Sequence, residues 1–161
     1  SISYNHPLYI RYGKKPMMDI HPPGTEFKIG KSIVVEKGED LTIVATGETL
    51  QRAYLASEIL KESNIHCSII SMHTIKPFDK KTFIEFSKNS KAILTVEEHS
   101  IFGGLGECCA SLIAQNNINV KLKILGIPDE YMINGSQADV LDHYDMSPEK
   151  IAEISKDLLN K

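Results

Sequence analysis

The feature that most constrains the fold is a short apolar run that ends in charged residues and leads through glycines into a helix. Residues 92–96 are predicted to form a buried strand, and residues 107–115 a helix. The polar residues that end the run are Glu97, Glu98 and His99. The glycines of the turn are Gly103, Gly104 and Gly106. In an open α/β sheet such a unit places its polar residues at the carboxyl edge, where ligands usually bind. The glycines do not form a dinucleotide fingerprint, so the alternative is that they only allow close packing of strand and helix.

Similar units recur along most of the chain. Strands are predicted over residues 32–36, 41–45, 66–71, 92–96 and 120–125. Helices are predicted over residues 49–63, 107–115, and after caps at Asp79, Ser136 and Ser147. The order ββαβαβαβαα predicts an α/β protein with a mostly parallel sheet covered on both faces. The short turn at residues 37–40 is expected to pair the first two strands as an antiparallel hairpin.

The first residues are predicted to belong to another unit. Residues 8–11 are typical of a short strand, but nothing before them offers a partner. Residues 16–26 are expected to be a linker, because Pro22, Pro23 and Gly24 interrupt regular structure. His6 and His21 are most simply explained as solvated. A strand, a linker and a compact remainder, without an initiator methionine, suggest a fragment or processed chain whose upstream domain is missing.

Composition argues against several classes of function. The net charge of −3 provides no basic surface for nucleic acid or an anionic membrane. No apolar run approaches the ~20 residues that span a bilayer. Cys67, Cys108 and Cys109 lack C-x-x-C spacing, so we expect reduced core cysteines in a cytoplasmic protein rather than a zinc site.

Ionisable residues collect at three predicted strand ends, and one edge of the sheet could hold them all. They are His73 and Lys76, then Glu97, Glu98 and His99, then Asp129 and Glu130. Carboxylates beside a histidine could do acid–base work if burial spread their pKa values. Alternatively, they cap helix amino ends and form ion pairs along a domain interface. The candidate polar edge therefore comprises His73, Glu97, Glu98, His99, Gly103 and Gly104. No H-x-x-x-H or H-E-x-x-H spacing is present, so no metal site is expected.

Two cations near the start form a separate candidate. Arg11 and Lys14 flank the flexible Gly13 at the end of a predicted strand. This arrangement suits an anionic group such as a phosphate. The alternative is a pair of solvated charges.

Four segments in order resemble one family. They are residues 42–47 (TIVATG), 71–79 (SMHTIKPFD), 96–106 (VEEHSIFGGLG) and 126–130 (GIPDE). The series resembles the C-terminal domain of transketolases, closest to the short or split bacterial and archaeal type. Residues 8–14 resemble the last strand of the preceding pyrimidine-binding domain, whose pattern is P-x-Y-I-R-x-G-R, with Lys14 in place of the final arginine.

This resemblance implies a three-layer α/β/α sandwich whose five-stranded mixed sheet has its first strand antiparallel. It divides the chain into the end of a pyrimidine-binding domain (1–15), a linker (16–26) and a C-terminal domain (27–161). It implies a homodimeric parent that moves a two-carbon ketol unit between sugar phosphates with thiamine diphosphate and magnesium. The family's G-D-G motif is absent here, as is its pyrimidine-domain glutamate, so the segment is expected to bind no cofactor, to hold no catalytic residue and to be inactive alone. Arg11 or Lys14 is implied as a sugar-phosphate contact.

Two alternatives remain open. The first is that the parent is a 1-deoxyxylulose-5-phosphate synthase or the β subunit of a 2-oxo-acid dehydrogenase, which have the same domain at their C-terminal ends. The second is that the chain is a regulatory module that holds a small anion at the glycine turn after Ser100, where helix amides are expected to point outward.

Overall fold

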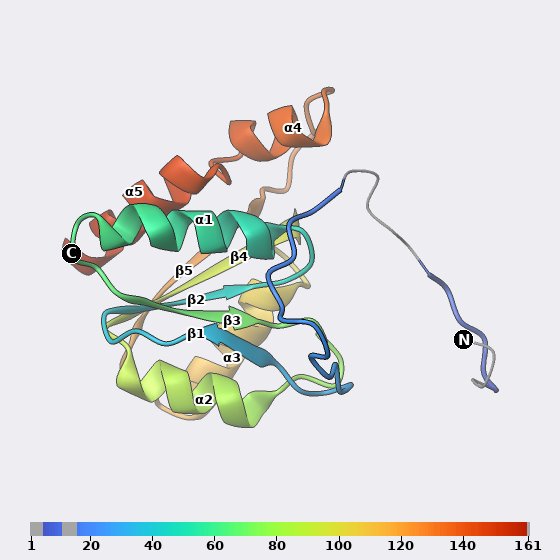
Figure 1. The fold of residues 1–161 in the computed structure, drawn as a ribbon, viewed down its shortest axis with the longest axis horizontal. Coiled ribbons are helices and arrows are strands. Elements are labelled where there is room, and N and C mark those ends of the chain that lie inside the picture. The colour runs from blue at the N-terminus through green and yellow to red at the C-terminus, as the bar shows by residue number, and fades with distance from the viewer. Residues whose placement is uncertain (1–4, 11–15, 161) are drawn as a thin grey trace.

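The computed structural model describes residues 5–10 and 16–160, and the elements follow the predicted order (Figure 1). The strands are β1 (Ile33–Glu36), β2 (Leu41–Ala45), β3 (Cys67–Ser71), β4 (Ala92–Ser100) and β5 (Lys121–Ile127). The helices are α1 (Thr49–Lys61), α2 (Lys80–Asn89), α3 (Leu105–Gln115), α4 (Gln137–His143) and α5 (Pro148–Asn160). The helix caps predicted from the sequence are also present. Asp79 accepts a hydrogen bond from the amide of Thr82, and Ser136 and Asp139 form a capping box.

The strands form one mixed sheet in the order β1-β3-β2-β4-β5, in which only β1 runs antiparallel. The antiparallel first strand is therefore confirmed, but the predicted hairpin is wrong because β3 lies between β1 and β2. Four extended residues span up to about 14 Å, which is enough to cross one strand whose two neighbours lie about 10 Å apart. The turn is tied to β3 where it crosses: the Gly38 amide donates to Ser68 Oγ over 2.9 Å, and this hydroxyl donates to the Gly38 carbonyl over 2.8 Å.

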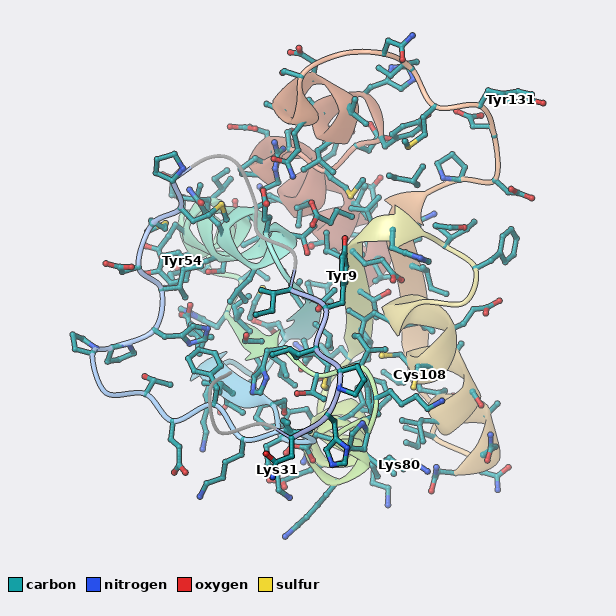
Figure 2. All side chains as sticks on the ribbon, turned by 90° about the vertical axis from the view of Figure 1, so that its right-hand side faces the viewer. Tyr9, Lys31, Tyr54, Lys80, Cys108 and Tyr131 are labelled. Carbon is teal, nitrogen blue, oxygen red and sulfur yellow. The ribbon has the colours of Figure 1, made fainter. Side chains whose placement is uncertain are left out.

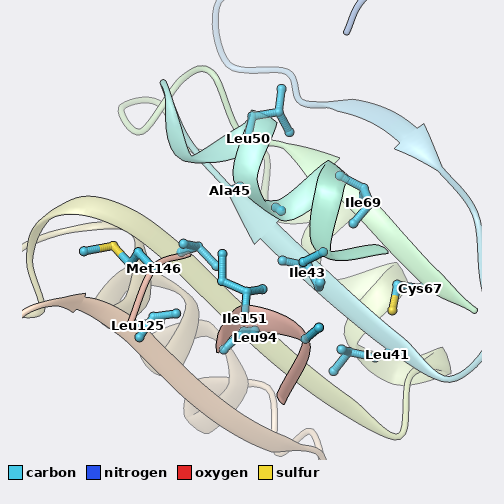
Figure 3. Close-up of a cluster of buried hydrophobic side chains, with 14 of the residues drawn as sticks. Leu41, Ile43, Ala45, Leu50, Cys67, Ile69, Leu94, Leu125, Met146 and Ile151 are labelled. Atoms are coloured by element: carbon cyan, nitrogen blue, oxygen red, sulfur yellow. The ribbon is translucent and has the colours of Figure 1, made fainter. Parts of the chain in front are cut away.

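Helices cover both faces of the sheet, so the predicted three-layer α/β/α arrangement is confirmed. α1 and α5 lie on one face, and α2 and α3 on the other (Figure 1). Successive strand residues enter opposite layers: Ile43 packs below α1 and α5, whereas Val44 packs against α2 and α3. The larger core gathers around Ile43, Ile69, Leu94 and Ile151 (Figure 3). Burial on both faces explains why the strands read as continuous apolar runs.

The two outer strands differ from the three inner ones. β1 has four residues, and its register with β3 shifts between Val34 and Glu36. β5 carries exposed lysines, Lys121 and Lys123, at alternate positions. Short, irregular or charged outer strands are poor templates for further strand pairing.

The segment before β1 departs from the prediction. Residues 8–10 are exposed, form no strand and lie away from the α/β body (Figure 1), since the described chain offers them no pairing partner. Arg11 and Lys14 lie outside the described residues. Residues 17–27, in contrast, lie along the carboxyl edge of the sheet. The helices formed by residues 5–10 and 16–160 include none with the length and hydropathy of a membrane-spanning segment.

Candidate functional site

The end of β4 sends its two neighbouring carboxylates to opposite sides of the sheet. β4 continues to Ser100, four residues beyond the predicted end, so Glu97, Glu98 and His99 are part of the strand. Side chains alternate between faces along a strand. Glu97 therefore turns toward α3, and Glu98 turns toward the linker and α4. The structure does not bring the two carboxylates together as a pair.

Glu97 caps helix α3. The residue is only 1% exposed, and its carboxylate accepts hydrogen bonds from the amides of Leu105 and Gly106, each over 2.7 Å. A side chain at Gly104 would collide with this carboxylate, and one at Gly106 would collide with Ile124. The capping interpretation is confirmed for Glu97, and close packing is confirmed as the role of these two glycines.

Four amides of the glycine turn donate hydrogen bonds within the protein. The amides of Leu105 and Gly106 already bind Glu97, and the Gly103 amide donates to Glu107 over 2.7 Å. The Phe102 amide donates to Ser100 Oγ over 3.2 Å. Four amides at this helix start are therefore bonded to groups of the protein itself, and binding of a small anion at the turn stays a prediction.

On the other side of β4, the carboxyl edge of the sheet forms an open cleft of about 1180 Å³. It lies where β2 and β4 run side by side while their following helices, α1 and α3, cover opposite faces. Such a switch point is the usual ligand site of an open α/β sheet. The lining comes from the linker and Phe27, the ends of β2, β3 and β4, and the starts of α1 and α4; its polar members include Asp19, His21, Glu48, Ser71, His73, Glu98 and Gln137.

Several contacts fix the walls of this cleft. Gln137 Nε2 donates to Glu98 Oε2 over 2.9 Å, which joins the start of α4 to β4. The Phe27 ring packs edge-on between the rings of His21 and His73, with both centroid distances 5.0 Å. His21 Nε2 lies 3.4 Å from Ser71 Oγ. The linker is thereby held against β3, so the expectation that His21 is merely solvated is wrong.

The surroundings of His21 in the cleft favour its neutral imidazole. Burial lowers the pKa of His21 below its ordinary value, and the neighbouring His73 ring lowers the same pKa further. His73 Nδ1 lies 3.0 Å from Thr74 Oγ1. Its Nε2 is buried and has no hydrogen-bond partner among residues 5–10 and 16–160.

The remaining candidates lie apart from the cleft. His99 is exposed, with Nδ1 3.0 Å from the Ser100 carbonyl. Asp129 and Glu130 are exposed in the loop after β5. In the described part of the chain, no three histidine, cysteine or acidic side chains are grouped so that they could hold a metal ion.

A match to a known family covers most of the chain. The family model described as "Transketolase, C-terminal domain" matches residues 30–151. The chain belongs to this family.

Relatives of this transketolase C-terminal domain are parts of larger enzymes. An apulose-4-phosphate transketolase subunit of Phocaeicola vulgatus is 35% identical over 161 residues, which cover 99% of this chain and 51% of that protein. "Putative transketolase C-terminal section" of Methanocaldococcus jannaschii is 41% identical over 152 residues, 93% of this chain and 47% of that protein. The chain thus spans about half the length of these relatives.

A solved structure has the same fold. It is described as "Split gene transketolase, inactive beta4 tetramer" and aligns with a TM-score of 0.82 and 25% identity. The alignment covers 89% of this chain and 46% of the other.

Sequence reasoning found His73 and Glu98 of the cleft but missed the residues that close it. His21 comes from the predicted linker, Phe27 directly follows it, and Gln137 comes from a helix start far along the chain. Only Phe27, a large apolar residue beside a proline- and glycine-bearing segment, gave a local signal that the linker is docked.

Proposed function

We propose that this chain is the C-terminal domain of a thiamine-diphosphate-dependent transketolase-like enzyme, with a structural and dimer-stabilising role. The observation that carries the proposal is the alignment of 99% of the chain with 51% of the transketolase subunit of Phocaeicola vulgatus. Residues 1–15 then end a pyrimidine-binding domain, residues 16–26 connect the domains, and residues 27–161 form the C-terminal domain. The parent enzyme is a homodimer in this proposal.

The chemistry belongs to the parts of the enzyme that this segment lacks. Thiamine diphosphate, held with magnesium by the pyrophosphate- and pyrimidine-binding domains, supplies the carbanion chemistry of two-carbon ketol transfer. Those domains belong to the same polypeptide or to a separate subunit. The segment contributes Arg11 or Lys14 as a contact to the sugar phosphate, and no catalytic residue. Free cysteines at positions 67, 108 and 109 accord with a cytoplasmic enzyme.

Exposed apolar side chains support an interface role. Phe102 follows β4, and Tyr131, Met132 and Ile133 follow β5, its neighbour in the sheet. Tyr131 is fully exposed and points away from the body of the domain (Figure 2). Large apolar residues that gather at one end of a sheet are typical of a surface that packs on another domain or subunit.

Calorimetry with thiamine diphosphate and magnesium tests whether cofactor binding belongs to the other domains of the enzyme. The 161-residue chain is expected to bind neither in the micromolar range. It is also expected to release no product from xylulose 5-phosphate by itself. Micromolar cofactor binding, or turnover by the chain alone, would contradict the proposal.

Reconstitution tests the enzyme class. Mixing the chain with its upstream half is expected to restore two-carbon transfer from xylulose 5-phosphate to an aldose phosphate. Activity with pyruvate instead would assign the parent to the 1-deoxyxylulose-5-phosphate synthase or 2-oxo-acid dehydrogenase type. A Phe102→Ser and Tyr131→Ser variant is expected to fold normally but to assemble more weakly, with Tyr54→Ser on α1 as the control.

A further inference from the structure

We propose that the loop between β5 and α4 makes Asn134 a site of spontaneous deamidation, at which the side-chain amide becomes the carboxylate of aspartate or isoaspartate. This modification site goes beyond the structural role proposed above and does not depend on it. Asn134 precedes Gly135 in this loop. Residues 129–137 are all exposed, and the loop projects from the domain at Tyr131 (Figure 2). Water and a base from solvent therefore reach the pair.

The reaction uses the backbone nitrogen of the next residue. The Gly135 amide gives its proton to a base from solvent, and its nitrogen attacks Cγ of Asn134. The new bond from nitrogen to Cγ closes a succinimide ring, while the bond from Cγ to the side-chain nitrogen breaks and ammonia leaves with a proton from water. A water molecule then opens the ring. Opening at Cγ gives aspartate, whereas opening at the backbone carbonyl gives isoaspartate and adds one carbon to the main chain.

Neither reacting group is engaged elsewhere in the described chain. Among residues 5–10 and 16–160, the Gly135 amide and the Asn134 side-chain amide have no hydrogen-bond partner. Glycine also reaches backbone conformations that a residue with a Cβ avoids. The pair is not held in the tight hairpin turn that Asn-Gly usually forms, because a helix follows it and neither residue has a positive φ.

Other asparagines of the described chain lack this freedom. The Asn116 side chain donates to the Leu112 carbonyl over 2.8 Å, and the amide of the following Asn117 donates to the Ala114 carbonyl over 3.2 Å. Closing a ring at Asn116 would require both bonds to break. The backbone amide of the next residue is likewise hydrogen-bonded after Asn64, Asn117 and Asn119.

Deamidation would alter the start of α4 and one wall of the cleft. Gly135 lines the cleft, and the following Ser136 is the N-cap of α4. The reaction adds a negative charge and, in isoaspartate, a longer main chain directly before this cap. In ¹H–¹⁵N NMR spectra of the modified chain, the amides of Ser136 and Gln137 are therefore expected to shift.

Peptide mass spectrometry of the 161-residue chain, incubated at mildly alkaline pH, measures the reaction. The peptide that contains Asn134 is expected to gain the mass of NH₂ replaced by OH before the peptide that contains Asn116 does. Both aspartate and isoaspartate are expected as products. Gly135→Ala is expected to slow the reaction about tenfold or more, because a Cβ restricts the backbone at this position. Aspartate without isoaspartate, or an unchanged rate in Gly135→Ala, would contradict the proposal.

Asn117→Gly provides a control with the same pair of residues in a different setting. Asn117 has a φ of 51°, so glycine fits there, and Asn116 then precedes a glycine as Asn134 does. In the folded variant, Asn116 is expected to react about tenfold or more slowly than Asn134, because its hydrogen bonds must first break. In urea the two rates are expected to converge. Equal rates in the folded variant, or a difference that persists in urea, would overturn the proposal.

Discussion

Removing the carboxylate of Glu97 should destabilise the domain more than any other single change at the polar edge. In Glu97→Ala the amides of Leu105 and Gly106 lose their acceptor. Both bonds are buried, and Glu97 as a whole is 1% exposed, so water does not readily take the place of the carboxylate. The start of α3 would also lose the negative charge that complements its dipole.

The magnitude follows from these two bonds. A buried donor left without a partner costs about 1–3 kcal/mol, so two such donors cost roughly 2–6 kcal/mol. The lost interaction with the helix dipole adds up to ~2 kcal/mol, while relaxation and water entry at the new cavity recover part of the total. We expect a loss of about 3–5 kcal/mol in the free energy of unfolding, a large share of the ~5–15 kcal/mol of a typical domain.

Urea unfolding followed by circular dichroism measures this loss. An unchanged slope of the unfolding free energy against urea concentration would show that only the stability has altered. Glu107→Ala is the matched control, because it removes the exposed bond to the Gly103 amide at the same turn. This control is expected to cost about 0.5–1 kcal/mol. If Glu97→Ala cost no more than Glu107→Ala, the reasoning that assigns the carboxylate to the helix start would be refuted.

Three further predictions concern neighbouring features. Gly104→Ala should destabilise the domain, because the new methyl group would displace the Glu97 carboxylate. In urea unfolding, the loss of unfolding free energy in the double variant with Glu97→Ala should be clearly smaller than the sum of the two single losses; a simple sum would count against the contact. His21 should titrate below its ordinary pKa in NMR, and His73→Asn should raise this pKa toward the ordinary value, whereas titration at or above 6.5 in the unmodified chain would be inconsistent with a docked linker. Since the folded-state pKa of His21 is lowered, its contribution is retained above pH 6.5 and lost as the pH falls toward the lowered value, so linker contacts should loosen on acidification. Cys108 should react first with iodoacetamide under native conditions, as read by peptide mass spectrometry, because the other two cysteines are buried; faster modification of either would contradict the packing.

The alternation of strands and helices could be predicted because its causes are local. Residues 41–45 and 92–96 are buried on both faces, which makes them continuous apolar runs. Asp79 and Ser136 allow the starts of their helices to be predicted, because a capping side chain binds amides only a few residues away. These interactions can be read from neighbouring letters of the sequence.

The neighbours of β1 could not be predicted from its turn. Four residues suffice both for a hairpin and for a crossing over one strand, so the length of the turn at 37–40 leaves the two open. The crossing is stabilised by Ser68, which lies 30 residues further along the chain. Its hydroxyl is hydrogen-bonded to both the amide and the carbonyl of Gly38. Such a contact has no local signature.

The polar edge was only partly predictable for a similar reason. The sequence identified Glu97 and Glu98 together, but the period of a strand separates them onto opposite faces once β4 is extended to Ser100. Glu97 then serves the fold, and Glu98 lines the cleft. Docking of His21 and Phe27 depends on the surface formed by β3, so their role appeared only with the tertiary structure.

The outer strands limit how this domain can join other proteins. Recruiting an additional strand at either border would require a long, regular row of free backbone groups, and neither border provides one. β1 is short, and its register with β3 shifts. The exposed lysines of β5 would lose bound water if another strand paired beside them. Contacts with another domain or subunit are therefore expected to use side chains on loops and helices rather than a continuous shared sheet.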